Sequence, residues 1–333
     1  MTNHRAVRYI QSQIKRCGVY RDVFNYINPI ITDVSLRDGI QGLTPEELPT
    51  EKKQKIFEYI YNLKFANNIE IGSVVSDKHM PIMKDVLGLY QSSIHYIESN
   101  EPIHEMRMAA EQEIDAYDPK LFALVPNLKK LKIATQHNMT NFAFVTSVSE
   151  RFQKMNLNQT LEEHNAELYK MGEYLYYNKR YYTKQMNTKL YISCINHCPI
   201  DGKMDTDAIV GHIINHACTE YYNEICLSDT CGSLSYQSYK IILDECLNYV
   251  NPDMISLHLH VNKNNNNEVE NIIRHSLNQG VHRFDVSLMD YGGCTMTMNQ
   301  EDRYNNLNYT LLCNILDKYV CENVDILKRI QDI

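Results

Sequence analysis

Long apolar runs, excess positive charge and paired cysteines are all missing from this 333-residue chain. No apolar run approaches the ~20 residues that cross a bilayer, so we expect no membrane segment. The net charge of −8 argues against a nucleic-acid partner, which usually needs clustered positive charge. Apart from Cys194 and Cys198, the ten cysteines show no paired spacing, and no apolar signal segment precedes them. We therefore expect an intracellular, most simply cytoplasmic, protein without a disulfide scaffold.

The N-terminus is basic. Its first 21 residues contain five Lys or Arg side chains and no acidic one. This composition fits either an organellar presequence or a short basic amphipathic helix that covers a domain. Because no linker interrupts the rest, we expect a basic helical extension over residues 1–28 and one domain over residues 29–333.

Short apolar runs alternate with stretches of helical periodicity. Strands are predicted at 29–36, 69–75, 121–126, 141–148, 190–196, 222–227, 254–260 and 283–289. Helices are predicted at 50–66, 160–177, 205–220, 237–249 and 268–279, the first with Thr50 as its cap and the last ending near Gly280. Eight such units indicate a parallel α/β fold closed into a (β/α)8 TIM barrel. The long stretch 90–118 predicts an inserted helical segment after the second strand.

The alternative fold is an open doubly wound sheet. The first strand is not followed by Gly-x-Gly-x-x-Gly, the pattern of a dinucleotide-binding turn. This absence makes the open sheet the weaker interpretation.

Polar side chains gather where the predicted strands end, which is where a barrel places its chemistry. His258 and His260 lie two apart at the end of an apolar strand, so both point to the same face. Neutral imidazole is a standard ligand of divalent metals, and a shared metal would explain the pair. Other groups at or near strand ends are Arg37, Asp38, Glu70, Asn127, Cys194, Cys198, Asp229 and, after two glycines, Cys294.

Each of these groups also has a purely structural interpretation. Asp38 could end a strand in a turn, and Glu70 could form a buried ion pair with Arg37. Asp229 could cap the following helix, and Cys294 could be a small apolar filler. Taken singly, none of them carries a function.

Taken together, the motifs resemble the DRE-TIM metallolyases, the superfamily of the pyruvate carboxyltransferase domain. The opening motif is DVSLRDGIQ at residues 33–41, and IEIGS, VPNL, YISCINHCP and EICLSDTCG follow in order. The His258-Leu-His260 run and the Gly-Gly-Cys294 loop complete the series. The last loop and the YISCINHCP segment favour the branch of 3-hydroxy-3-methylglutaryl-CoA (HMG-CoA) lyase.

The resemblance implies a metal site. Asp38, His258 and His260 match the family's ligands, and Asn306 is the best match to a fourth, with Asn305 nearly as good. One carboxylate, two imidazoles and an amide oxygen suit Mg²⁺ or Mn²⁺.

The resemblance also implies catalytic roles in a carbon–carbon cleavage. Arg37 would stabilise the developing oxyanion, and Cys294 would protonate the thioester enolate. Glu70 and Asp229 would orient Arg37 and the proton-transfer network, while His258 would share the base role with metal binding. The expected substrate is HMG-CoA or a related 3-hydroxyacyl-CoA, and a homodimer is compatible with the family.

The chain departs from the family in its loops. Residues 295–302 contain no glycine, and Val261-Asn262-Lys263 replaces an Asp-Thr-Tyr sequence. No acidic residue follows the ligand asparagine near Thr310. Two further functions therefore stay open: a Claisen-type acyl-CoA synthase of the same superfamily, and a barrel that binds metal or acyl-CoA without turnover.

Overall fold

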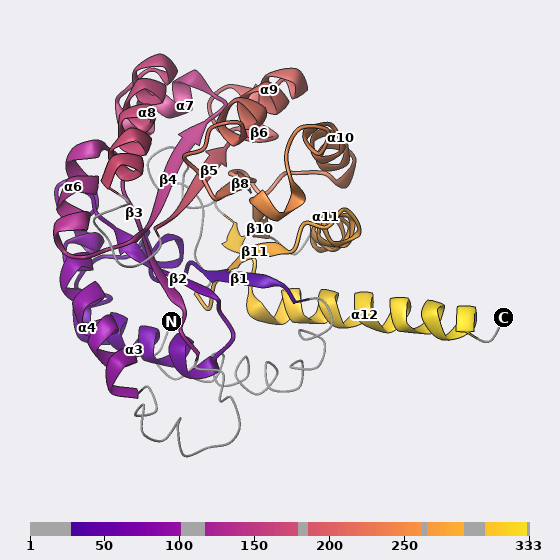
Figure 1. Ribbon diagram of the computed structural model, residues 1–333, viewed down its shortest axis with the longest axis horizontal. Helices are drawn as coiled ribbons and strands as arrows, with labels where there is room; N and C mark the ends of the chain where they lie inside the picture. Colours follow the sequence, from indigo (N-terminus) through magenta and orange to yellow (C-terminus); the bar gives the residue numbers. More distant parts are fainter. Residues whose placement is uncertain (1–27, 101–116, 179–185, 262–264, 290–303, 332–333) are drawn as a thin grey trace.

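The computed structural model describes residues 28–100, 117–178, 186–261, 265–289 and 304–331. Its centre is a closed barrel of parallel strands in the order β1-β11-β9-β8-β5-β4-β3-β2 (Figure 1). The strands are β1 (Ile30–Asp33), β2 (Asn68–Ser73), β3 (Lys120–Leu124), β4 (Asn141–Ser147), β5 (Asn187–Ser193), β8 (Glu224–Ser228), β9 (Ile255–His258) and β11 (Arg283–Val286). Each overlaps one predicted apolar run, so the TIM barrel is confirmed and the open sheet is wrong.

Helices surround the barrel (Figure 1). They are α3 (Thr50–Leu63), α4 (Val86–Asn100), α6 (Leu128–Gln136), α7 (Glu150–Leu157), α8 (Leu161–Asn178), α9 (Thr206–Ala217), α10 (Tyr236–Cys246), α11 (Asn266–Asn278) and α12 (Tyr309–Gln331). All five predicted helices are present. None of the helices within the described ranges is long and apolar enough to cross a bilayer.

Two local predictions at helix ends have different outcomes. The predicted Thr50 cap is wrong, because Pro49 is the N-cap residue and Thr50 begins α3. The Thr50 hydroxyl instead donates a hydrogen bond to Asp85 Oδ2 at 2.6 Å. Gly280 follows α11 with a φ of 82°, the left-handed conformation that glycine adopts without strain.

Three predictions fall wholly or partly outside the described residues. Helix α4 occupies the first part of the stretch 90–118, and residues 101–116 are not described. The predicted basic extension covers residues 1–28, of which 1–27 are not described. Cys294 with its loop lies within 290–303, also outside the described residues.

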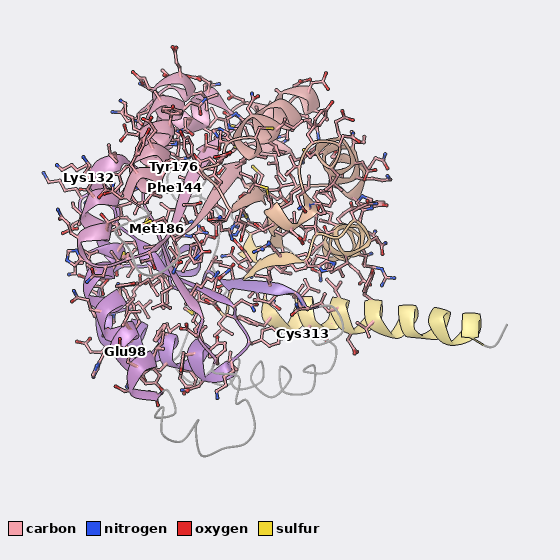
Figure 2. All side chains as sticks on the ribbon, in the orientation of Figure 1. Glu98, Lys132, Phe144, Tyr176, Met186 and Cys313 are labelled. Atoms are coloured by element: carbon pink, nitrogen blue, oxygen red, sulfur yellow. The ribbon has the colours of Figure 1, made fainter. Side chains whose placement is uncertain are left out.

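The apolar core lies between the strands and the helices. On β5, Leu190 and Ile192 are fully buried in this layer. Phe144 of β4 belongs to the same layer, whereas Tyr176 of α8 is exposed (Figure 2). Because neighbouring side chains of a strand alternate in direction, Lys189 and Tyr191 point into the barrel. The barrel interior is therefore lined by polar side chains at these positions, while the apolar side chains face the helices.

Two short antiparallel ribbons extend from the barrel. One pairs β6 (His197–Cys198) with β7 (Gly202–Lys203), and the other pairs β10 (His260–Val261) with β12 (Asn305–Asn306). In the second ribbon, His260 lies directly opposite Asn306. Single 3₁₀ turns occur at η1 (Asp38–Ile40), η2 (Pro81–Met83) and η4 (Pro252–Met254).

Candidate active site

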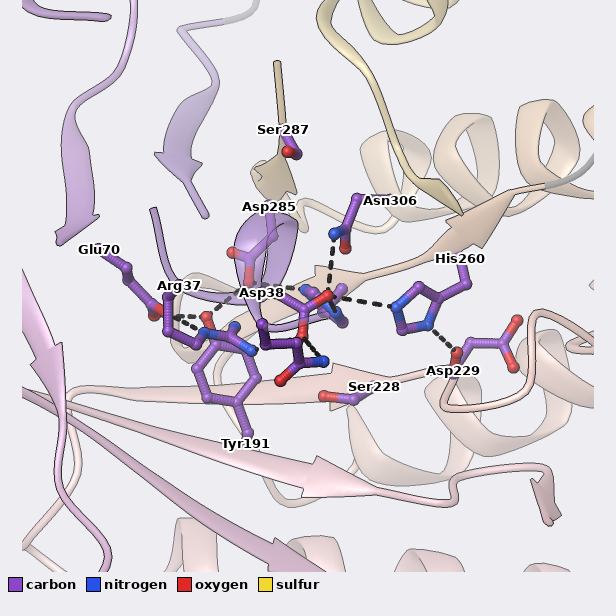
Figure 3. Close-up of polar contacts among 12 residues, drawn as sticks. Arg37, Asp38, Glu70, Tyr191, Ser228, Asp229, His260, Asp285, Ser287 and Asn306 are labelled. Atoms are coloured by element: carbon purple, nitrogen blue, oxygen red, sulfur yellow. Dashed lines mark hydrogen bonds and ion pairs between the residues drawn. The ribbon is translucent and has the colours of Figure 1, made fainter. Parts of the chain in front are cut away.

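Asp38 and His260 face each other at one end of the barrel (Figure 3), and His258 lies beside them. Asp38 begins the η1 turn after β1, His258 ends β9 and His260 begins β10. The carboxylate Oδ2 of Asp38 lies 3.7 Å from Nε2 of His258 and 3.5 Å from Nε2 of His260. All three side chains are buried, and their ligand atoms lie within 4.8 Å of one another. The structure thus brings together the three residues that the sequence predicted as metal ligands.

The other ring nitrogen of each histidine has its own partner. Nδ1 of His260 lies 2.7 Å from the backbone carbonyl of Asp229. A carbonyl only accepts, so Nδ1 of His260 carries a proton, and Nε2 is the ring nitrogen that faces Asp38. Nδ1 of His258 lies 3.2 Å from Oδ2 of Asp285, and the same reasoning leaves its Nε2 available as a ligand.

The protonation of the three groups follows from burial and charge. Burial favours the neutral acid of Asp38, but the Arg37 guanidinium and both imidazoles hold the pKa of this carboxyl well below its usual range. Burial lowers the pKa of His258. For His260 burial is the largest single effect and acts in the same direction, but the contacts and charge of Asp38 and Asp229 together outweigh it and raise the pKa. An ionised carboxylate therefore faces the two imidazoles.

Asn306 completes the group. Its Nδ2 lies 2.8 Å from Oδ2 of Asp38, and its side chain is buried. Amide nitrogen and oxygen are assigned from hydrogen-bond partners, so turning the amide by 180° places Oδ1 at this position as a metal ligand. Asn305 is exposed, so the geometry favours Asn306 as the fourth ligand.

Charge inside the barrel favours a cation. Among the described ion pairs of the interior, three cationic side chains face four carboxylates: Arg37, Lys189 and Arg283 against Asp38, Glu70, Glu224 and Asp285. The carboxylates of these ion pairs therefore outnumber the cationic side chains by one. Because a mixed oxygen and imidazole set suits Mg²⁺ or Mn²⁺, the residues present fit such an ion.

Arg37 lies beside the candidate ligands. Its Nε is 2.6 Å from Oε2 of Glu70, and its Nη1 is 2.9 Å from Oδ1 of Asp38. Its guanidinium lies over the ring of Tyr191, 4.7 Å from the centroid. Nη2 is buried and donates to no group in the described part of the chain. The ion pair with Glu70 therefore holds the guanidinium in place, and Nη2 remains able to donate a hydrogen bond.

The other predicted site residues lie differently. The Asp229 carboxylate accepts hydrogen bonds from the backbone amides of Ser233 and Leu234 ahead of α10. Its carbonyl, not its carboxylate, therefore contacts His260. Asn127 caps α6 by accepting from the Lys130 amide at 2.9 Å. Cys294 lies outside the described residues.

Sequence reasoning missed four buried polar residues of the interior. They are Lys189 and Tyr191 of β5, Glu224 of β8 and Asp285 of β11. Lys189 forms ion pairs with Asp285 and, at 3.0 Å, with Glu224. Glu70 was noticed because it is an ionisable residue within an apolar strand. Lys189, Glu224 and Asp285 show the same pattern and could have been found in the same way.

Comparison with known proteins identifies the family. Residues 28–308 match the family model described as HMGL-like. The chain belongs to this family. It is 26% identical over 270 residues to the cytoplasmic HMG-CoA lyase of Rattus norvegicus, covering 79% of this chain and 68% of that protein. A 3-hydroxy-3-isohexenylglutaryl-CoA/hydroxymethylglutaryl-CoA lyase of Pseudomonas aeruginosa is 26% identical over 266 residues, with 79% and 77% covered.

Solved structures agree on the fold. An HMG-CoA lyase from Acinetobacter baumannii, in complex with coenzyme A and 3-methylmalate, superposes with a TM-score of 0.67 at 24% identity. The match covers 90% of this chain and 84% of that one. The HMGL-like chain is thus a DRE-TIM barrel whose relatives are lyases. Those relatives include cytoplasmic and mitochondrial forms, which agrees with an intracellular protein.

Proposed function

We propose that this HMGL-like protein is a divalent-metal-dependent carbon–carbon lyase that cleaves HMG-CoA, or a related 3-hydroxyacyl-CoA. The products are acetyl-CoA and acetoacetate, or the corresponding oxo acid. The observation that carries the proposal is the position of Arg37. Its guanidinium forms an ion pair with the candidate metal ligand Asp38 and a second ion pair with Glu70.

The cleavage requires three changes in the substrate. The tertiary hydroxyl loses its proton to a base, the adjacent carbon–carbon bond breaks, and a ketone and a thioester enolate form. The enolate carbon then takes a proton. The positive charge of Mg²⁺ or Mn²⁺, when bound, would favour loss of the hydroxyl proton. Asp38, His258, His260 and Asn306 would hold this ion.

Arg37 has the role of a fixed donor. Glu70 and Asp38 take up Nε and Nη1, so Nη2 is the donor left for a substrate oxygen that gains negative charge. A donor held in place before the reaction stabilises the transition state without reorganisation. Cys294 is proposed to give its thiol proton to the enolate carbon, following the family resemblance.

Two roles are proposed for His258. Its Nδ1 contacts Asp285 and its Nε2 faces Asp38, which supports metal binding. The base that takes the hydroxyl proton, a role that the family resemblance also gives to His258, stays a prediction. Asp229 supports the site through its carbonyl contact to His260.

One assay tests this function. Purified protein is supplied with Mn²⁺ or Mg²⁺ and HMG-CoA, and acetoacetate is measured, with His258→Ala and Cys294→Ala as controls. We expect acetoacetate from the wild type and none from His258→Ala. Metal binding without product from this substrate or related 3-hydroxyacyl-CoAs would contradict the lyase and favour a binding barrel. Product formed from acetyl-CoA and a 2-oxo acid would instead favour the synthase.

Three properties remain part of the proposal. An acyl-CoA partner is supported by the family, one member of which was solved with coenzyme A. A homodimer and a cytoplasmic or organellar compartment are expectations from the resemblance and the basic N-terminus.

A further inference from the structure

The polar groups inside the barrel form one connected network (Figure 3). The Tyr191 hydroxyl lies 2.5 Å from Oε1 of Glu70 and 2.7 Å from Oδ2 of Asp285. Glu70 contacts Arg37, and Asp285 contacts His258. Tyr191 thus joins the arginine of the site to one of its candidate ligands. It does so through Glu70, which the sequence had singled out, and through Asp285, which it had not.

We propose that Asp285, held by Lys189 and Tyr191, is a positioning residue that fixes the ring proton of His258 on Nδ1 and thereby presents Nε2 to the metal. This inference rests on the proposed function for its purpose. Its structural basis is the set of contacts made by the two oxygens of Asp285.

Those two oxygens have different partners. Oδ1 forms the ion pair with Nζ of Lys189, while Oδ2 contacts the Tyr191 hydroxyl and Nδ1 of His258. Lys189 has donors only, so it keeps Asp285 as an ionised acceptor. An ionised carboxylate can accept but not donate, and the proton of the His258–Asp285 bond must therefore sit on the ring nitrogen.

The two histidines differ in the group that fixes the proton on Nδ1. His260 is oriented by the backbone carbonyl of Asp229, which no side-chain substitution removes. His258 depends on the Asp285 side chain. Substitution of Asp285 therefore acts on one of the two imidazoles, and its effect on metal binding can be assigned.

Asp285→Asn is the informative variant because Lys189 sets the orientation of the new side-chain amide. Its oxygen turns toward the Lys189 ammonium, which leaves the NH₂ group facing Nδ1 of His258. The NH₂ group donates to Nδ1, so the ring proton moves to Nε2 and blocks the ligand position. The variant keeps the volume of the side chain, and Lys189 retains its ion pair with Glu224.

The double variant Asp285→Asn/Lys189→Met makes the opposite prediction. Without the ammonium, the amide oxygen can turn toward the two donors, the Tyr191 hydroxyl and the His258 Nδ1–H. The original tautomer returns, and metal binding recovers. Glu224 keeps Arg283 as a partner at 3.3 Å, so the second substitution leaves no buried carboxylate alone. A residue with a merely structural role would show additive loss instead.

Two measurements on the full-length protein test the inference. Metal-stripped protein is titrated with Mn²⁺ by electron paramagnetic resonance, and the ring ¹⁵N shifts of His258 are recorded by NMR, assigned against His258→Gln. We expect Asp285→Asn to weaken Mn²⁺ binding about 10- to 100-fold and to move the proton to Nε2. The double variant should regain most of the affinity and the Nδ1 proton.

Lys53→Met is the matched control. It removes another buried lysine, whose partners are Asp85 and the Ile82 carbonyl, and should leave the Mn²⁺ affinity unchanged. Unaltered Mn²⁺ affinity or an unaltered His258 tautomer in Asp285→Asn would overturn the inference, whatever the effect on turnover. If wild-type protein bound no Mn²⁺, the metal site of the proposed function would fail, while the tautomer would still decide the role of Asp285.

Discussion

His260 and Asn306 are cross-strand partners in the β10–β12 ribbon. This pairing directs the Asn306 amide to the Asp38 carboxylate, 2.8 Å away and 268 residues distant in the chain. The ribbon is only two residues long in each strand. Its position explains why a residue beyond the last barrel strand still reaches the candidate ligands.

The ribbon predicts unequal effects at two adjacent asparagines. Asn306→Ala should weaken Mn²⁺ binding about tenfold or more, because a loss of ~1.4 kcal/mol in binding free energy corresponds to a factor of ten. Asn305→Ala should leave the affinity within twofold, because its side chain is exposed. Isothermal titration calorimetry of the metal-stripped proteins measures both. Equal losses in the two variants would remove Asn306 from the ligand set.

Substitutions of Asp38 and Cys294 should affect metal binding and turnover differently. Asp38→Ala removes the only carboxylate of the proposed ligand set, so both Mn²⁺ affinity and acetoacetate production should fall. Cys294→Ala should keep the wild-type Mn²⁺ affinity and lose turnover, because its proposed role is proton donation to the enolate. The same calorimetric titration combined with the HMG-CoA assay distinguishes them. Loss of metal in both variants would show that the assigned roles are wrong.

Arg37→Lys tests the donor that faces the substrate. Lysine keeps the positive charge beside Glu70 and Asp38 but lacks the planar fork that binds both and still offers Nη2. We expect kcat to fall by roughly 10²–10³, the usual cost of one oxyanion donor, with Mn²⁺ affinity within a few-fold. A rise in KM at unchanged kcat would assign Arg37 to substrate binding alone.

Stability should fall as the pH falls from 7 to 5. Burial lowers the pKa of His216 to about 3 and that of His212 to about 4, and neighbouring histidines add to the effect. The unfolded chain binds these protons near pH 6.5, whereas the folded chain does not, so acid favours unfolding. The two groups together cost on the order of 4 kcal/mol at pH 5.

Urea denaturation at several pH values measures this slope. His216→Gln removes one of the titrating groups and should make the slope between pH 7 and pH 5 shallower. The exposed His79→Gln is the control and should leave the slope unchanged. If His216→Gln unfolded with the wild-type pH dependence, the buried histidines would not be its source.

The barrel could be predicted from the sequence because its signal is local. Each strand is a short apolar run, and helical periodicity separates the runs, so eight units can be counted without knowledge of their contacts. Strand ends were less accurate: β9 stops at His258, and Leu259 interrupts the run before His260 begins β10. The two rings still meet at Asp38, because the residues on either side of one position share a face.

The interior network could not be predicted in the same way. Lys189, Glu224 and Asp285 are distant in sequence, and each looks like an isolated polar residue in an apolar strand. Their pairing depends on the barrel register, which sets Lys189 directly beside Glu224. The predicted carboxylate role of Asp229 likewise depended on side-chain direction, and its carboxylate bonds to the loop before α10. Sequence indicates which residues are unusual, whereas register decides which ones meet.

The contact between Asp38 and Asn306 joins the turn after β1 to the segment that precedes α12. A chain that ends before β12 contains Asp38, His258 and His260 but lacks the amide that is proposed as the fourth ligand. An ion that binds the folded chain and not the unfolded one stabilises the fold in step with its affinity. Protein trimmed ahead of residue 306 should therefore lose much of its metal-dependent gain in stability even where its eight strands are intact.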